Sequence, residues 1–139
     1  MPLLTRWYIK SALIYLIAAM LVGLLRTDQQ GVAAASLIAA AGPVQVHLLV
    51  VGWVTQMIFG VAYWMFPKYS PKSPRGNSAV AVMTFGLLNV GLLLLVAAEP
   101  LHTLRPSPAL GWLLAVSALA QWFAAVGFVA TTWPRVKSK

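Results

Sequence analysis

The stretch Gly42–Pro71, GPVQVHLLVVGWVTQMIFGVAYWMFPKYSP, contains the segment that decides the fold. Residues 44–66 carry no charged side chain, and Pro67 ends this run before a basic turn. A helix needs about 20 apolar residues to cross the hydrocarbon core of a bilayer. The segment is therefore predicted to span a membrane, and it places one imidazole, His47, about one turn inside its start.

The composition of the whole chain is that of a membrane protein. Of its 139 residues, 60% are hydrophobic and 9% are charged, whereas soluble domains carry about 25% charged residues. A soluble core of this size could not bury so much apolar surface. The sequence has no cysteine, which removes disulfides, thioether-attached haem, iron–sulfur clusters and thiolate zinc sites.

Three further segments resemble the first one in length and apolarity. The expected spans are residues 7–25, 44–66, 78–98 and 110–133, within a single membrane domain, 1–139. The fold class is therefore expected to be all-α: an integral membrane four-helix bundle with up-down topology.

Two segments between these spans have a distinct character. Residues 31–42, GVAAASLIAAAG, are too few to span a bilayer and too apolar for an exposed loop. They are predicted to form a short interfacial helix or an early extension of the second span. Residues 99–108, EPLHTLRPSP, are predicted to form the loop before the fourth span.

Basic residues divide unevenly between the two sides that these spans define. One side would hold Arg6, Lys10, Lys68, Lys72, Arg75, Arg135, Lys137 and Lys139. The other would hold Arg26 and Arg105, together with both acidic residues, Asp28 and Glu99. Lys/Arg-rich loops stay in the cytoplasm, so both termini are expected to be cytoplasmic, in a multi-pass protein of a bacterial-type inner membrane. The net charge of +8 then indicates lipid headgroups, and not nucleic acid, as the partner.

Four polar side chains stand near the centres of the four spans: Tyr15, Gln56, Asn89 and Gln121. Hydrogen bonds between helices in a membrane contribute about 1 kcal/mol each, so these groups are predicted to form a clasp at the midplane. The alternative is a path for protons or solutes. Because no Asp, Glu, Lys or Arg lies deep in a span, ion- or proton-coupled transport is disfavoured.

The faces of the second span indicate which side meets the bundle. At about 100° per residue, one side carries Gly52, Gln56, Gly60 and Tyr63, and small residues there let another helix approach closely. His47 is expected to point the other way, toward lipid, another subunit or a bound apolar cofactor. The residues expected beneath it are Val50, Val51, Val54, Ile58 and Val61.

His47 has two interpretations. It is either an interfacial histidine bonded to a headgroup, water or a carbonyl, or an axial ligand of haem b, since neutral imidazole is a common haem ligand and the porphyrin needs an apolar wall. His102, expected on the same membrane side, is either a solvated loop histidine or the second ligand. A second copy of His47 is the other candidate for that ligand. Arg26 and Arg105 are candidate partners for haem propionates.

Two stretches resemble a known family: RWYIKSALIYLIAAMLVGLL, residues 6–25, and GPVQVHLLVVGWVTQMIFGVAYWMFPK, residues 42–68. They are similar to the start of the catalytic subunit of haem–copper oxygen reductases, most of all the C-type oxidases and their nitric oxide reductase relatives. In that family the second helix opens with a histidine that binds the low-spin haem b near the outer surface. The resemblance implies this role for His47 and would make the chain the first four spans of a longer fold.

The chain departs from the family pattern in the residues that carry its chemistry. The family's second ligand to the low-spin haem comes from a helix further downstream, and the copper histidines, the high-spin haem histidine and the crosslinked tyrosine have no counterparts. In an alternative alignment with the family, His47 matches a copper ligand of a later helix. The family has two adjacent histidines after that ligand, and this chain offers only His102 for them. The chain alone is therefore not expected to be an enzyme.

The expected function is a haem-b-binding membrane protein or subunit of a respiratory or photosynthetic electron-transfer complex. It would act beside other membrane subunits or a second copy of itself. The alternatives are a cofactor-free structural or accessory subunit that packs against a larger membrane complex, and a small transporter or sensor.

Overall fold

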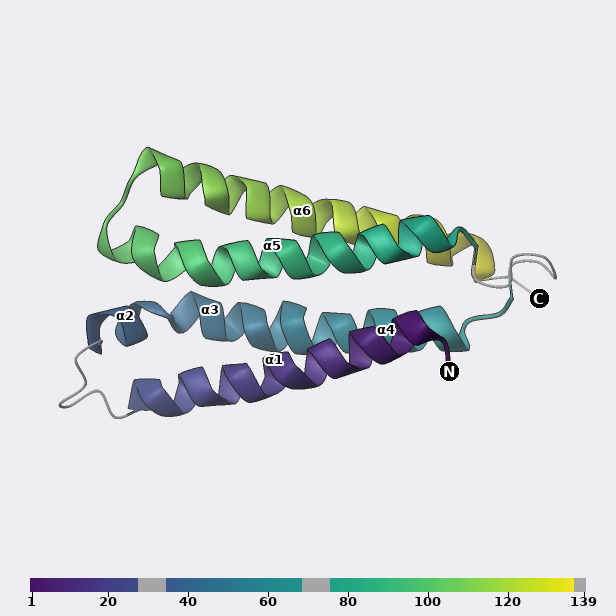
Figure 1. Cartoon of the computed structure of the whole chain (residues 1–139), viewed down its shortest axis with the longest axis horizontal. Coiled ribbons are helices and arrows are strands. Elements are labelled where there is room, and N and C mark those ends of the chain that lie inside the picture. The colour runs from purple at the N-terminus through teal and green to yellow at the C-terminus, as the bar shows by residue number, and fades with distance from the viewer. Residues whose placement is uncertain (28–34, 69–75, 137–139) are drawn as a thin grey trace.

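Four long helices lie side by side in the computed structural model of the chain (Figure 1). The structure describes residues 1–27, 35–68 and 76–136. Within these ranges it is helical, without strands, and each long helix has the length and apolarity to cross a membrane. The expected charges at Asp28, Lys72, Arg75, Lys137 and Lys139 lie outside the described residues.

The elements follow one another in a simple order. The first span is α1, Leu3–Thr27, and the short helix α2, Ala35–Ala40, precedes the second span. The second span is continuous but made of three parts: α3, Gly42–His47; the π-helix η1, Leu48–Thr55; and α4, Gln56–Met65. The third and fourth spans are α5, Ser78–Leu104, and α6, Pro108–Thr132, which ends in the 3₁₀ turn η2, Trp133–Arg135.

The helices form two pairs because glycines let backbones approach. Gly91 of α5 lies against the carbonyl of Ser117 on α6, and these two helices pack along their length. Gly52 and Gly60 of the second span lie against Tyr15 and Tyr8 of α1. In Figure 1, α5 and the second span face each other, with α6 and α1 on the outside.

The π-helix η1 keeps one column of the second span facing the bundle. Val44, Leu48, Gly52 and Gln56 recur every four residues, and all four are buried. In an α-helix of about 3.6 residues per turn, such a repeat drifts around the axis by about 40° at each step. A π-helix, with hydrogen bonds from i to i+5 and roughly 4.4 residues per turn, turns the repeat back the other way. The combination holds the buried column straight.

The exposed side of the same span differs from the expected stripe under His47. Val50, Val54 and Ile58 are exposed, and they continue the column that begins at Val46. Val51, four residues after His47, packs against both core clusters instead. If the helix turned by a constant 100° per residue, Val51 would lie on the outward side. The π-helix has more residues per turn, and this moves Val51 inward.

Two apolar clusters fill the bundle, one toward each end. The cluster nearer the N-terminus of α1 is aromatic: Phe59 and Phe128 stack with ring centroids 3.8 Å apart, and Tyr8 meets Phe85 edge-on at 4.9 Å. The cluster at the other end consists of Ala19, Val44, Leu48, Leu92 and Leu95. The hydrogen-bonding side chains described below lie between the two.

Helix α5 is longer than expected, and this corrects the predicted loop at residues 99–108. The helix continues through Pro100 to Leu104, so Glu99 and His102 are helical. A proline inside a membrane helix leaves one carbonyl without its helical donor, which neighbouring elements can tolerate. Pro106 ends the helix instead, because the residue before a proline avoids the α conformation, and Arg105 is accordingly outside it at φ −140° and ψ 82°.

The segment before the second span contains a separate helix. Residues 35–40 form α2, and Ala41 makes a turn before α3 begins at Gly42. Of the two alternatives for residues 31–42, a short helix describes residues 35–40, whereas residues 31–34 lie outside the described residues and Gly42 begins the second span. Pro43 stands in the first turn of α3, where its missing N–H costs no helical bond.

We expect Gly60→Ala to destabilise the pairing of α1 with the second span. A Cβ at Gly60 would lie 2.6 Å from Tyr8 Cβ, a rigid atom, so the backbones must separate. Overpacking of this kind costs about 1–3 kcal/mol. The measurement is unfolding of the purified protein in detergent, followed by circular dichroism.

Gly86→Ala is the matched control, since nothing lies within 4 Å of a Cβ at that position. It should leave stability unchanged or raise it by up to about 1 kcal/mol, because alanine favours helix over glycine. Equal stability of the two variants would contradict the close contact at Gly60.

Candidate functional site

Three of the four midplane side chains form one hydrogen-bonded group. The Tyr15 hydroxyl donates to Asn89 Oδ1 at 2.9 Å. The amides of Gln56 and Asn89 bond each other in both directions, at 3.3 and 3.1 Å. Asn89 Nδ2 also donates to the carbonyl of Phe85 at 2.8 Å. This group, called the Asn89 node below, joins α1, the second span and α5 at one depth.

Gln121 does not join the Asn89 node. Its Nε2 donates to Ser117 Oγ on the same helix at 3.1 Å, and that hydroxyl donates to the carbonyl of Gly91 at 2.7 Å. Ser117 is fully buried, and it is the residue that ties α6 to α5 at this depth. A search for amides at span centres finds Gln121 but overlooks Ser117, because serine is common in membrane helices without a role in contacts between helices.

His47 stands at the junction of α3 and η1, and its side chain is half-buried. Its Nδ1 lies 2.9 Å from the carbonyl oxygen of Pro43, one turn earlier. Because a carbonyl can only accept, Nδ1 carries the proton in this bond, and in the neutral imidazole Nε2 then has the lone pair. The imidazole is thus oriented by its own helix, with the nitrogen that ligates metals left as an acceptor.

The other histidine lies on a different part of the bundle. His102 is in the last turn of α5, half-buried, and its Nε2 is 3.8 Å from the place where a Cβ would stand at Gly111 of α6. It therefore faces α6, and it is not a histidine of a solvated loop. Arg105, the residue after that helix, is exposed.

Arg26 is brought to the same short helix as His47. Its Nη1 donates to Gln45 Oε1 at 2.9 Å, and its Nη2 is 3.0 Å from the Cβ position of Gly42. A cation in the last turn of α1 also opposes the negative end of the helix dipole. The structure thus sets a guanidinium from α1 against the helix that ends at His47.

Arg135 has a role that the sequence analysis missed. It was counted among the basic residues of the cytoplasmic side, yet its side chain is only 1% exposed. Its Nε donates to the carbonyl of Pro67 at 3.0 Å, and its Nη2 donates to those of Tyr63 and Phe66 at 3.1 and 2.7 Å. The guanidinium also lies over the Tyr63 ring, 5.9 Å from its centroid.

The bonds from Arg135 to the carbonyls of Tyr63, Phe66 and Pro67 are called the Arg135 clamp below. The sequence around Pro67 explains why this clamp is needed. In a continuing helix the carbonyl of Tyr63 would accept from the N–H of residue 67, but proline has none. The last carbonyls of a helix need other donors, and a cation there also opposes the helix dipole. Arg135, directly after Pro134, closes the bundle by joining the end of α6 to the end of α4. The sequence does contain a signal for this role, because Arg135 directly follows Pro134, which ends the fourth span.

The described residues offer few groups for catalysis. No cluster of three or more His, Cys, Asp or Glu side chains that could hold a metal ion occurs in residues 1–27, 35–68 and 76–136. The Asn89 node is neutral, and its amides bond each other and the carbonyls of Phe85 and Gly52, which makes it suited to holding helices together. Among the described residues, His47 is the candidate ligand. Its ring is oriented by the Pro43 carbonyl, and its second nitrogen can accept a bond.

No protein-family model, curated protein or solved structure matches this chain.

We expect Asn89→Leu to lower the free energy of unfolding in detergent by about 1–2 kcal/mol, because the Tyr15 hydroxyl loses its acceptor and the Gln56 amide keeps only its bond to the Gly52 carbonyl at 3.5 Å. In a double-mutant cycle, Tyr15→Phe and Asn89→Leu should be coupled by about 0.6 kcal/mol or more. The matched cycle of Tyr15→Phe with Gln121→Leu should be additive. Additivity in both cycles would show that the Asn89 node does not form.

We expect Arg135→Gln to destabilise the protein by about 2 kcal/mol, because charge-assisted bonds to the carbonyls at the end of α4 are lost. Lys68→Gln is the control, since Lys68 is exposed beside the same helix end and loses the same charge. Thermal unfolding in detergent measures both variants. If they shift the midpoint equally, the effect is one of charge and the clamp contributes nothing.

Proposed function

We propose that this chain is a haem-b-binding membrane subunit of an electron-transfer complex, with His47 as an axial ligand. The observation that carries the proposal is the bond from His47 Nδ1 to the Pro43 carbonyl, which orients the ring and leaves Nε2 as the ligating atom. Haem supplies a one-electron carrier when bound. The chain supplies the ligand, an apolar wall and a nearby cation.

The residues around His47 fit a haem held at the surface of the bundle. Val50, Val54 and Ile58 form an exposed apolar column along the same helix, and a porphyrin needs such a wall. Arg26, held against α3 through Gln45, is the nearer candidate for a propionate. Because the wall is open on its far side, another membrane subunit or a second copy of the chain would complete the site and supply the second ligand.

The proposal includes an orientation in the membrane. The chain would cross the inner membrane of a bacterial-type cell in up-down fashion with both termini in the cytoplasm. Arg6, Lys10 and Lys68 are exposed and belong to the side richer in basic residues, which supports this orientation. His47 and Arg26 would then lie toward the outer surface.

A cofactor-free structural subunit is the second candidate. The observation that favours it is the self-sufficient interior: the Asn89 node and the Ser117–Gly91 bond pair the midplane polar groups with each other. A bundle built in this way holds its fold without a cofactor. Its exposed apolar faces would then pack against a larger complex, and His47 would be an interfacial histidine.

We expect the protein, purified gently from membranes after expression with haem supplementation, to show a b-type reduced-minus-oxidised spectrum. A pyridine haemochrome assay should give one haem per one or two chains. In His47→Ala the Soret band should be lost, because the helix then lacks its ligand, while circular dichroism stays unchanged.

His102→Ala is the control at the other histidine. If it alters the spectrum without removing haem, His102 is the second ligand; if it changes nothing, the partner provides that ligand. A colourless wild-type protein, or a His47→Ala variant with an unchanged Soret band, would overturn the proposal in favour of the structural subunit.

A further inference from the structure

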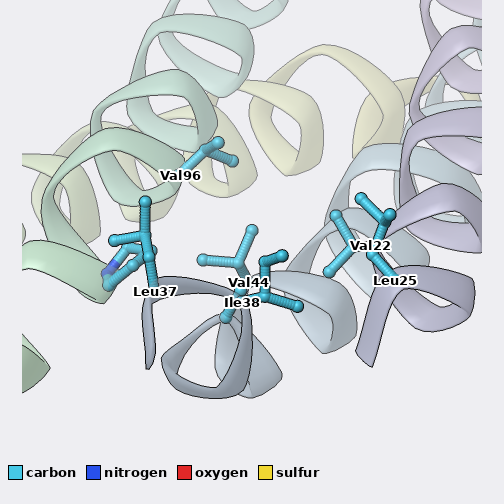
Figure 2. Close-up of a pocket in the computed structure, with 8 residues that line it drawn as sticks. Val22, Leu25, Leu37, Ile38, Val44 and Val96 are labelled. Atoms are coloured by element: carbon cyan, nitrogen blue, oxygen red, sulfur yellow. The ribbon is translucent and has the colours of Figure 1, made fainter. Parts of the chain in front are cut away.

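An apolar cavity lies between four elements at the end of the bundle where α1 ends and the second span begins. Figure 2 shows Val22 and Leu25 of α1 on one side, Leu37 of α2 and Val96 of α5 on the other, and Val44 of α3 and Ile38 of α2 between them. Ala41 and Pro100 also line it, and its volume is about 200 Å³. The side chains that line the cavity are all apolar.

The chemistry of this lining excludes water and favours a hydrocarbon occupant. A buried water needs two to four polar partners, which this lining does not offer, and the cavity is partly open to the surroundings of the bundle, so a hydrocarbon chain can enter it. An empty cavity is destabilising, because its lining forgoes dispersion contacts. Around helices of this apolarity the abundant hydrocarbon is the acyl chain of the bilayer itself.

A cation stands at one end of the cavity. Arg26 follows Val22 by four residues and so lies one turn further along the same face of α1. Its guanidinium packs against Gly42, the residue after Ala41 in the cavity wall. Arg26 donates to Gln45, and a guanidinium presents five N–H donors in a fork whose geometry matches a phosphate.

We propose that this cavity is a phospholipid site, with the end of one acyl chain among Val22, Val44 and Val96 and the phosphate beside Arg26. The two halves of a phospholipid match the two parts of the site: hydrocarbon with the apolar cavity, anion with the cation at its end. Leu37 and Ile38 place α2 over the chain, so the lipid would tie this short helix to α1 and α5. The site uses neither histidine of the haem proposal, but it shares Arg26, which is there the candidate partner of a haem propionate.

The test compares lipid retention in two valine variants of the same helix. The full chain is reconstituted in nanodiscs of phosphatidylcholine and phosphatidylglycerol and then transferred to detergent. Native mass spectrometry measures the number of phospholipids that remain bound to each chain. Wild type should retain one phospholipid per chain. Val96→Phe fills the cavity and should lose it, whereas Val90→Phe, on the exposed side of α5, should retain it.

Two further variants keep the outcome decisive. Ala41→Leu narrows the cavity from another part of its lining and replaces Val96→Phe if that protein does not fold. Arg26→Gln should reduce the preference for phosphatidylglycerol over phosphatidylcholine about fivefold. The proposal is overturned if wild type retains no lipid, or if Val96→Phe and Ala41→Leu both retain it as wild type does.

Discussion

The constraint that shapes this protein is that a polar group inside hydrocarbon must find its partner within the protein. Asn89 meets it by accepting from Tyr15 and exchanging hydrogen bonds with Gln56, so three helices are held at one depth and in one rotation. Ser117 meets it between α5 and α6 by donating to the carbonyl of Gly91. Each bond contributes modestly to the free energy of unfolding. Together the bonds allow few ways of shifting or rotating one helix against another.

Close packing follows from the same registers. Asn89 and Gln56 can meet only if the second span and α5 keep facing each other, and the π-helix η1 straightens the column that holds Gln56. The glycines of that span then admit the backbone of α1. At the other end of the span, Arg135 supplies the donor that Pro67 lacks, so that the last helix is anchored to the second. The hydrogen bonds between polar side chains and the close packing of the helices therefore support one another.

The two proposed binding features lie at the other end of the second span, away from the Arg135 clamp. His47 is oriented on the outer face of the span, while the apolar cavity lies on its inner side, under α2. Arg26 contacts the short helix between them. The polar side chains of the Asn89 node lie in the middle of the bundle and bond one another and the Phe85 carbonyl. We therefore expect binding at this end to leave the midplane unchanged, with the Asn89 node holding the helices together and not the ligand.

The sequence by itself determined the membrane class, the four spans and the polar residues at their centres, because apolar length and composition are local properties that no tertiary contact alters. It also indicated the bundle-facing side of the second span, since Gly52, Gln56 and Gly60 recur at helical spacing. Tertiary structure decided the rest. Gln121 pairs with Ser117 and not with Asn89, and Arg135 is buried although it belongs to a basic tail. These outcomes depend on which helix ends and carbonyls lie opposite each other, and residues as far apart in sequence as Tyr63 and Arg135 carry no local record of that.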